Sequence, residues 1–153
     1  MEHEGLDPSE VRARVLSEHE AIRERLRVIE GHAERVREEP TLRGPLQHAL
    51  IALVPVVRAH ADFEDVALAP ALLEADAFGD VRTDRLAEHH ERLRADMERL
   101  EAELGDGEAS VASLLAWSRW MTLRLREDMA DEERHLLRPD ILRDDIVTSG
   151  LDG

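Results

Sequence analysis

The stretch "VRARVLSEHEAIRERLRVI", residues 11–29, decides the fold class, because its apolar residues recur at every third or fourth position. This spacing is the period of one face of an α-helix, and charged residues fill most of the other positions. The stretch therefore predicts an amphipathic helix whose buried stripe is Val11, Val15, His19, Ile22, Leu26 and Ile29. A histidine in the middle of such a stripe needs a hydrogen-bond partner or a metal ion.

Breaker residues around this stretch divide the chain into four helical segments. "DPSE" at 7–10 starts the first helix with a capping aspartate, a proline and a carboxylate three positions after the cap. "EEPTLRGP" at 38–45 links it to a second helix, which runs from residue 46 to about residue 75. Pro55 lies inside this second helix and is expected to kink it.

The last two helices are bounded in the same way. "FGD" at 78–80 makes a turn, Thr83 or Asp84 is expected to cap the third helix, and "GDG" at 105–107 ends it. Ser110 is expected to cap the fourth helix, which Pro139 stops or bends.

Four helices with short links, and no stretch with the alternation of a strand, predict an all-α, antiparallel up-down four-helix bundle. Residues 8–142 form this single domain, and residues 1–7 and 143–153 are expected to be flexible ends. Residues 58–73 and 127–142 share several identities at a fixed offset, so the bundle is expected to consist of two related helical hairpins.

Charge and composition exclude several classes of partner and site. The 20 Lys+Arg against 35 Asp+Glu give a net charge of −15, which repels nucleic-acid phosphates and anionic membranes. The chain has no cysteine, which excludes disulfides and thiolate metal sites. The longest apolar run, residues 49–57, is shorter than the ~18 residues of a membrane span. We therefore expect a cytoplasmic soluble protein that binds no nucleic acid and no membrane, with any metal held by nitrogen and oxygen.

Five residues form a candidate metal site of that kind. His19, His60 and His90 each replace an apolar residue on the inward stripe of a different helix. Glu64 follows His60 by one helical turn, so both can reach a common ion, and Glu133 takes the equivalent place on the fourth helix. Imidazole and bridging carboxylate ligands suit a pair of divalent ions such as iron or manganese in a bundle core, and zinc tolerates the same donors.

These residues resemble the hemerythrin-like, or HHE cation-binding, family over nearly the whole chain, residues 11–141. That family has one histidine on helices 1 and 3, and H-x-x-x-E with a following proline on helices 2 and 4. The matching segments are "SEHEAI" with His19, "HADFEDVALAP" with His60 and Glu64, "EHHERL" with His89 or His90, and "MADEERHLLRP" with Glu133. We favour His90 over His89, because "HERL" at 90–93 repeats "HEAI" at 19–22.

The resemblance implies a hemerythrin-like bundle with a non-haem di-iron site that binds, senses or reduces dioxygen, peroxide or nitric oxide. Five of the six ligands that it implies are present, and Met129 stands at the position of the sixth. A thioether is a poor ligand for iron surrounded by nitrogen and oxygen donors.

Three interpretations of Met129 stay open. A two-ion site can persist, with water, substrate or a neighbour filling the sixth position; the candidate positions are Met129 itself, Asp128, Glu132 and His89. Alternatively, the site holds a single ion. In the third interpretation the chain is a metal-free bundle that acts as an interaction or structural module. Iron is the expected cofactor, the expected assembly is a monomer or a homodimer, and the sequence does not choose between binding, sensing and catalysis.

Overall fold

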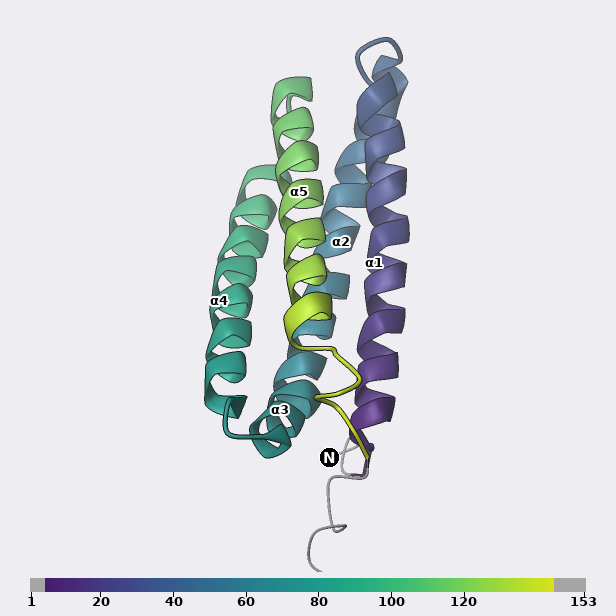
Figure 1. The fold of residues 1–153 in the computed structure, drawn as a ribbon. Coiled ribbons are helices and arrows are strands. Elements are labelled where there is room, and N and C mark those ends of the chain that lie inside the picture. The colour runs from purple at the N-terminus through teal and green to yellow at the C-terminus, as the bar shows by residue number, and fades with distance from the viewer. Residues whose placement is uncertain (1–4, 145–153) are drawn as a thin grey trace, which may run out of the picture.

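The computed structural model describes residues 5–144, so most of the expected flexible ends, residues 1–4 and 145–153, lies outside the described residues. Its helices form four long rods, one of which consists of three consecutive helical segments (Figure 1). The elements are α1 (Pro8–Arg35), the 3₁₀ turn η1 (Pro40–Leu42), α2 (Arg43–Phe63), the π-helical segment η2 (Glu64–Leu68), α3 (Ala69–Ala75), α4 (Gly79–Leu104) and α5 (Val111–His135). Residues 5–144 contain no strand, which confirms the predicted all-α class.

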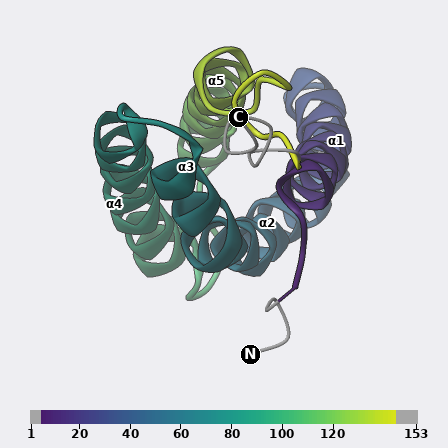
Figure 2. The same ribbon diagram turned by 60° about the horizontal axis from the view of Figure 1, so that its bottom comes forward.

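The rods are antiparallel neighbours around a common centre (Figure 2). The first rod, α1, packs against α2 and α5, while α4 packs against α2, α3 and α5, so the order around the bundle is α1, α2, α4, α5. The predicted up-down four-helix bundle is therefore confirmed. No helix within residues 5–144 is long and apolar enough to cross a membrane.

The helix ends agree with the sequence at three places, and two helix starts differ. The second helix, α2, begins at Arg43, before the expected start at residue 46. The Asp7 N–H donates to Glu10 Oε2 at 2.8 Å, and the Ser113 N–H donates to the Ser110 hydroxyl at 3.1 Å, as expected of the two caps. The third rod, α4, ends just before Gly105, as predicted, but it begins at Gly79, about one turn before the expected caps Thr83 and Asp84. At Gly79 a Cβ atom would lie 2.5 Å from the backbone oxygen of residue 72, so glycine allows α4 to start against α3.

The second rod changes its helical geometry at the segment η2. Pro55, which was expected to kink this rod, lies inside α2, and the helix continues through it. The change in hydrogen bonding comes later. There the Ala69 N–H donates to the Glu64 carbonyl, five residues back, as in a π-helix. Short π-helical segments inside α-helices occur often at functional sites. Glu64, the first residue of η2, is one of the candidate ligands.

A polar layer divides the apolar core into two clusters. One cluster fills the half of the bundle with the loop between α4 and α5, and includes Ile22, Val57, Leu93 and Met129. The other fills the half with α3, and includes Val15, Phe63, Leu86 and Leu136. Between them every rod carries buried polar residues, which are His19, His60, Glu64, His89, His90 and Glu132.

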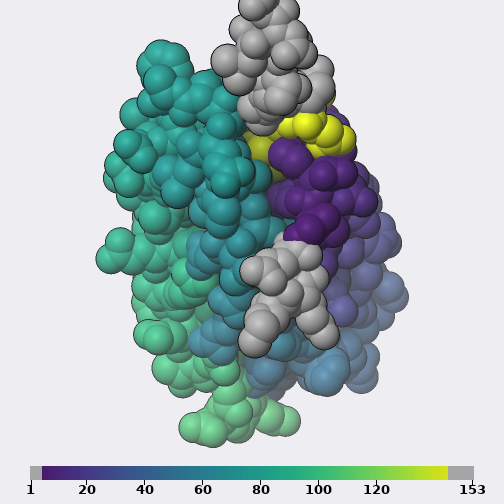
Figure 3. Space-filling view, turned by 90° about the horizontal axis from the view of Figure 1, so that it is seen from below, coloured from purple at the N-terminus to yellow at the C-terminus, as the bar shows by residue number. Residues whose placement is uncertain are grey.

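The segment after α5 covers the end of the bundle near the polar layer. Figure 3 shows this segment, in yellow, against the first turns of α1, in purple. Arg12 Nε donates to the Leu137 carbonyl at 2.5 Å, and the Ser9 hydroxyl donates to Asp144 at 2.6 Å. Its apolar side chains Leu136, Leu137, Ile141 and Leu142 are buried. Asp144, within the end that was expected to be flexible, is thus bonded to α1.

Candidate metal centre

Four ligand atoms from three rods meet in the polar layer. They belong to His19, His60, Glu64 and Glu132, and all four lie within 4.8 Å of one another. The side chains are buried, with exposed fractions between 0% for His19 and 7% for His60. Imidazole nitrogens and carboxylate oxygens are borderline and hard donors, so this group has the chemistry of a site for a divalent transition-metal ion.

Three imidazoles are held in the same way, with Nδ1 toward the outside of the bundle and Nε2 toward its centre. In each case Nδ1 lies within hydrogen-bond distance of a carboxylate. The pairs are His19 with Glu133 at 2.7 Å, His60 with Glu18 at 2.7 Å, and His90 with Asp65 at 2.6 Å. A carboxylate that accepts the N–H of one ring nitrogen fixes the tautomer in which the other nitrogen carries a lone pair for a metal.

Arginines hold these outer carboxylates in turn. The contacts are Arg23 to Glu133 at 2.7 Å, Arg14 to Glu18 at 3.2 Å, and Arg94 to Asp65 at 2.6 Å. Each imidazole therefore ends an arginine–carboxylate–histidine chain that starts at the surface. This repeated arrangement orients Nε2 toward the centre of the layer. A histidine that merely fills the core would not need its inner nitrogen to be oriented in this way.

The inner atoms face one another closely. Glu64 Oε1 lies 2.9 Å from His60 Nε2 and 3.2 Å from His90 Nε2, and Glu132 Oε1 lies 3.3 Å from His19 Nε2. Within the part of the chain that the structure describes, four of the inner atoms have no hydrogen bond: His19 Nε2, His60 Nε2, Glu64 Oε2 and Glu132 Oε1. Buried polar atoms are normally satisfied, so this convergence fits a cation that all four would bind.

Charge in the layer shifts the pKa of several groups. Burial lowers the pKa of His60, but the carboxylates of Glu18 and Glu64 beside its ring outweigh burial and raise it to about 10. Burial raises the pKa of Glu64, but the imidazoles of His60 and His90 beside it hold it far below its ordinary range. The pKa of His90 is also raised, because Glu64 and Asp65 outweigh the effect of burial. Glu64 and Glu132, the two buried carboxylates of the layer, thus favour positive charge beside them, either as protons on the imidazoles or as a metal ion.

Of the five predicted ligands, the structure places His19, His60, Glu64 and His90 in the layer, and it places His90 and Glu133 outside the four-atom cluster. Glu133 is 27% exposed and contacts the outer nitrogen of His19, whereas the neighbouring Glu132 points inward. The apolar stripe of α5 contained the signal for this difference. Glu132 follows Met129 by three positions and precedes Leu136 by four, which puts it on the buried face.

The remaining candidate positions lie beside the cluster. Met129 is buried in the larger apolar cluster. Asp128 is half-buried, and burial raises its pKa. His89 is buried beside His90, although the repeat of "HEAI" by "HERL" favoured His90 alone.

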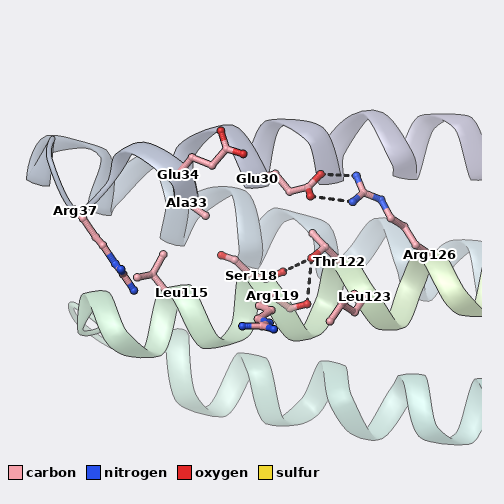
Figure 4. A pocket seen from close by; sticks show the side chains of 10 residues that line it. All are labelled: Glu30, Ala33, Glu34, Arg37, Leu115, Ser118, Arg119, Thr122, Leu123 and Arg126. Carbon is pink, nitrogen blue, oxygen red and sulfur yellow. Dashed lines mark hydrogen bonds and ion pairs between the residues drawn. The ribbon is translucent and has the colours of Figure 1, made fainter.

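Three surface grooves differ in their relation to this layer. A groove of about 510 Å³ between α1 and α5 is crossed by the ion pair of Glu30 and Arg126 (Figure 4). Its buried hydroxyls, on Ser118 and Thr122, both donate to carbonyls of their own helix, so they are not free to act on a ligand. Two other grooves reach the layer. One of about 330 Å³ is lined by His60 and Glu18, and one of about 510 Å³ by His90 and Asp65.

In a comparison with protein families, the chain matches the sequence model described as the hemerythrin HHE cation binding domain over residues 11–139. The matched range includes every residue of the polar layer. Comparison with curated proteins and with solved structures gives no match for the chain.

Proposed function

Because the chain belongs to the family of hemerythrin HHE cation binding domains, we propose that it binds non-haem iron and uses it to bind, sense or reduce a small oxidant. The observation that carries this proposal is the meeting of four buried ligand atoms within 4.8 Å. The three arginine–carboxylate–histidine chains support it, because metal-binding histidines usually have such an outer partner.

The donor set favours a divalent transition-metal ion over calcium or magnesium. Two imidazoles and two carboxylates, without thiolates, suit iron or manganese, and zinc is compatible with the same donors. Calcium and magnesium prefer sites made of oxygen alone. The resemblance of the sequence to a family with non-haem iron decides between iron and manganese in this proposal.

The protein residues have separate tasks around the ion. His19, His60, Glu64 and Glu132 would hold it, while Glu133, Glu18 and Asp65 keep the imidazole protons on the outer nitrogens. Bound iron would supply the change of oxidation state and the position at which dioxygen, peroxide or nitric oxide binds. Apolar clusters on both sides of the layer keep bulk water away from that position.

Access to the layer is suited to small molecules. His60 and His90 line the two grooves that approach it, and their side chains are 7% and 2% exposed. A diatomic molecule or peroxide needs only a small opening beside these rings, whereas a larger substrate would have to separate the rods. We therefore favour a small oxidant as the ligand, with the protein as a monomer or a homodimer.

The second candidate function is that of a metal-free interaction or structural module. One observation favours it: each inward imidazole lies close enough to a carboxylate for a protonated histidine to neutralise it. A polar layer of this kind can be satisfied without a metal, and Met129 would then be an ordinary core residue.

Iron content separates the two candidates. The full chain is stripped with a chelator, loaded with ferrous iron without oxygen, desalted and analysed for bound iron. We expect iron to remain bound to the unchanged chain and to the control Glu24→Ala, whose carboxylate is exposed, and to be lost from Glu64→Ala. Absence of bound iron from the unchanged chain would overturn the proposal and favour the metal-free module.

The oxidant is tested on the loaded protein. Exposure to dioxygen, to peroxide and to nitric oxide in separate samples should change the visible spectrum for at least one of them. A spectrum that stays unchanged with all three, while iron remains bound, would overturn the oxidant part of the proposal and leave iron binding intact.

A further inference from the structure

The outward side of α5 is largely apolar, whereas the outward sides of α1 and α4 are mostly charged. Residues 111–126 contain three arginines and no carboxylate, in a chain with 35 Asp+Glu. Trp120 and Leu123 are 46% and 54% exposed. The exposed residues of α5 recur at helical spacing and so form one face. This α5 face consists of Ala112, Ala116, Arg119, Trp120, Leu123 and Glu127.

Grooves lie on both sides of the α5 face. The groove of about 510 Å³ between α1 and α5 has Arg119 and Leu123 on its α5 side (Figure 4). A second groove, of about 320 Å³, lies between α4 and α5 and is lined by Ala116, Trp117 and Trp120. Helices of two molecules pack by placing the ridge of one in a groove of the other. An exposed tryptophan beside arginines is also typical of the centre of a protein interface.

Two charges of the α5 face have no partner in the part of the chain that the structure describes. Arg119 precedes Leu123 by four residues, and Glu127 follows it by four. Neither side chain makes a hydrogen bond or an ion pair with any of residues 5–144. Arg126, at the edge of the face, is by contrast already paired with Glu30. The face thus carries one unpaired positive and one unpaired negative charge, placed symmetrically about its central leucine.

We propose that the α5 face binds the same face of a second copy of this chain, with the two α5 helices antiparallel about a two-fold axis at Leu123. A residue on such an axis meets its own copy, so the two Leu123 side chains pack together. Arg119 comes level with Glu127 of the partner subunit, which gives two equivalent ion pairs. A parallel arrangement would instead place Arg119 against Arg119 and Glu127 against Glu127, and like charges repel.

The charge of the whole molecule favours this face for self-association. Each copy carries a net charge of −15, so most approaches of two copies bring carboxylates together. Glu24 on α1 and Glu91 on α4 are examples of such exposed carboxylates. The α5 face has only Glu127, and in the dimer this carboxylate meets an arginine. An acidic partner of another kind would find the same arginines but would leave Glu127 unpaired, so a second copy is the better fit.

Sedimentation of the full, metal-free chain at increasing concentration tests the inference. We expect the mass to rise toward twice the 17.3 kDa of one chain. Leu123→Asp places two carboxylates at the axis and should abolish the dimer. Val28→Asp is the matched control, because it replaces a residue that is 48% exposed in the middle of α1, and it should associate like the unchanged chain. Circular dichroism checks that both variants remain helical.

Variants of the two charged residues test the antiparallel arrangement. Arg119→Glu turns both attractive pairs into repulsive ones, and Glu127→Arg does the same. Each variant alone should therefore weaken the dimer by about 30-fold, or about 2 kcal/mol. An equal mixture of the two variants should form a heterodimer about as tight as the unchanged dimer, because each chain then offers the charge that the other chain lacks.

The possible results separate the parts of the inference. A monomer at every concentration would overturn it and leave the α5 face to a different partner. A dimer that survives Leu123→Asp, or that is lost in a helical Val28→Asp, would overturn it by placing the interface elsewhere on the molecule. Charge variants that bind as tightly as the unchanged chain, or a mixture that stays monomeric, would overturn the antiparallel arrangement. The inference does not depend on iron, so iron content decides the proposed function separately.

Discussion

Separate replacement of Glu132 and Glu133 by alanine distinguishes a metal ligand from a residue that orients one. Glu132 belongs to the four-atom cluster, whereas Glu133 accepts from the outer nitrogen of His19. Zinc-finger peptides bind zinc with roughly 10–16 kcal/mol, and if this scale is applied to a four-ligand site and shared evenly, one ligand contributes roughly 2.5–4 kcal/mol. We therefore expect Glu132→Ala to weaken binding by about 60- to 700-fold.

Glu133→Ala should have a smaller effect. Loss of an outer partner of a metal-binding histidine typically costs about 10- to 100-fold in affinity. The lower end applies here, because the Glu133 side chain is 27% exposed and water can take its place beside His19. We expect a loss of about 10-fold, or about 1.4 kcal/mol.

Competition with a chromophoric chelator under anaerobic conditions measures both affinities. Glu127→Ala, on the same helix and exposed, is the matched control, and circular dichroism checks that all three variants remain helical. A larger loss of affinity in Glu133→Ala than in Glu132→Ala would refute this reasoning. Glu133, the residue that the sequence pattern indicated, would then be the ligand.

Three further predictions concern the scaffold. Gly79→Ala should destabilise the fold by about 1–3 kcal/mol in urea unfolding, because its Cβ would lie 2.5 Å from a backbone oxygen. Gly44→Ala, which has open space around it, should not destabilise the fold. Equal losses in the two variants would contradict the close approach at Gly79. Leu50→Ala, in the larger apolar cluster, should lose about 2–5 kcal/mol, against less than about 0.5 kcal/mol for the exposed Leu73→Ala. The hydrogen bond from Arg126 lowers the pKa of Glu30, so this pair stabilises the fold above the ordinary glutamate pKa and loses its effect as pH falls through the lowered value. In Glu30→Gln the free energy of unfolding should therefore fall less as the pH is lowered, and the difference should be less than about 1 kcal/mol. If its dependence on pH is the same as in the unchanged chain, the pair does not contribute.

The helical periodicity was enough to predict the bundle and most of its boundaries. Asp7 and Ser110 mark helix starts in the sequence because capping is a local interaction. The start of α4 at Gly79 depends instead on the close approach of α3, a tertiary contact with no local signal beyond the glycine. The π-helical segment at Glu64 likewise has no signature in the hydrophobic pattern.

The candidate site was predictable in kind, because histidines on inward stripes are visible in the sequence. The sequence showed less clearly which of two adjacent residues, Glu132 or Glu133, points inward. The repeat between the two hairpins indicated Glu133, but the stripe of α5 carries Glu132 inward and leaves Glu133 to His19 Nδ1. Burial of both His89 and His90 depends on how α4 is rotated against α2 and α5, which is set by packing.

The most direct test of metal binding is a crystal structure of the iron-loaded protein with diffraction data collected on both sides of the iron absorption edge. The account predicts an anomalous peak among His19 Nε2, His60 Nε2, Glu64 and Glu132. An iron-loaded crystal without a peak in the polar layer, or with iron only at the surface, would contradict the central claim.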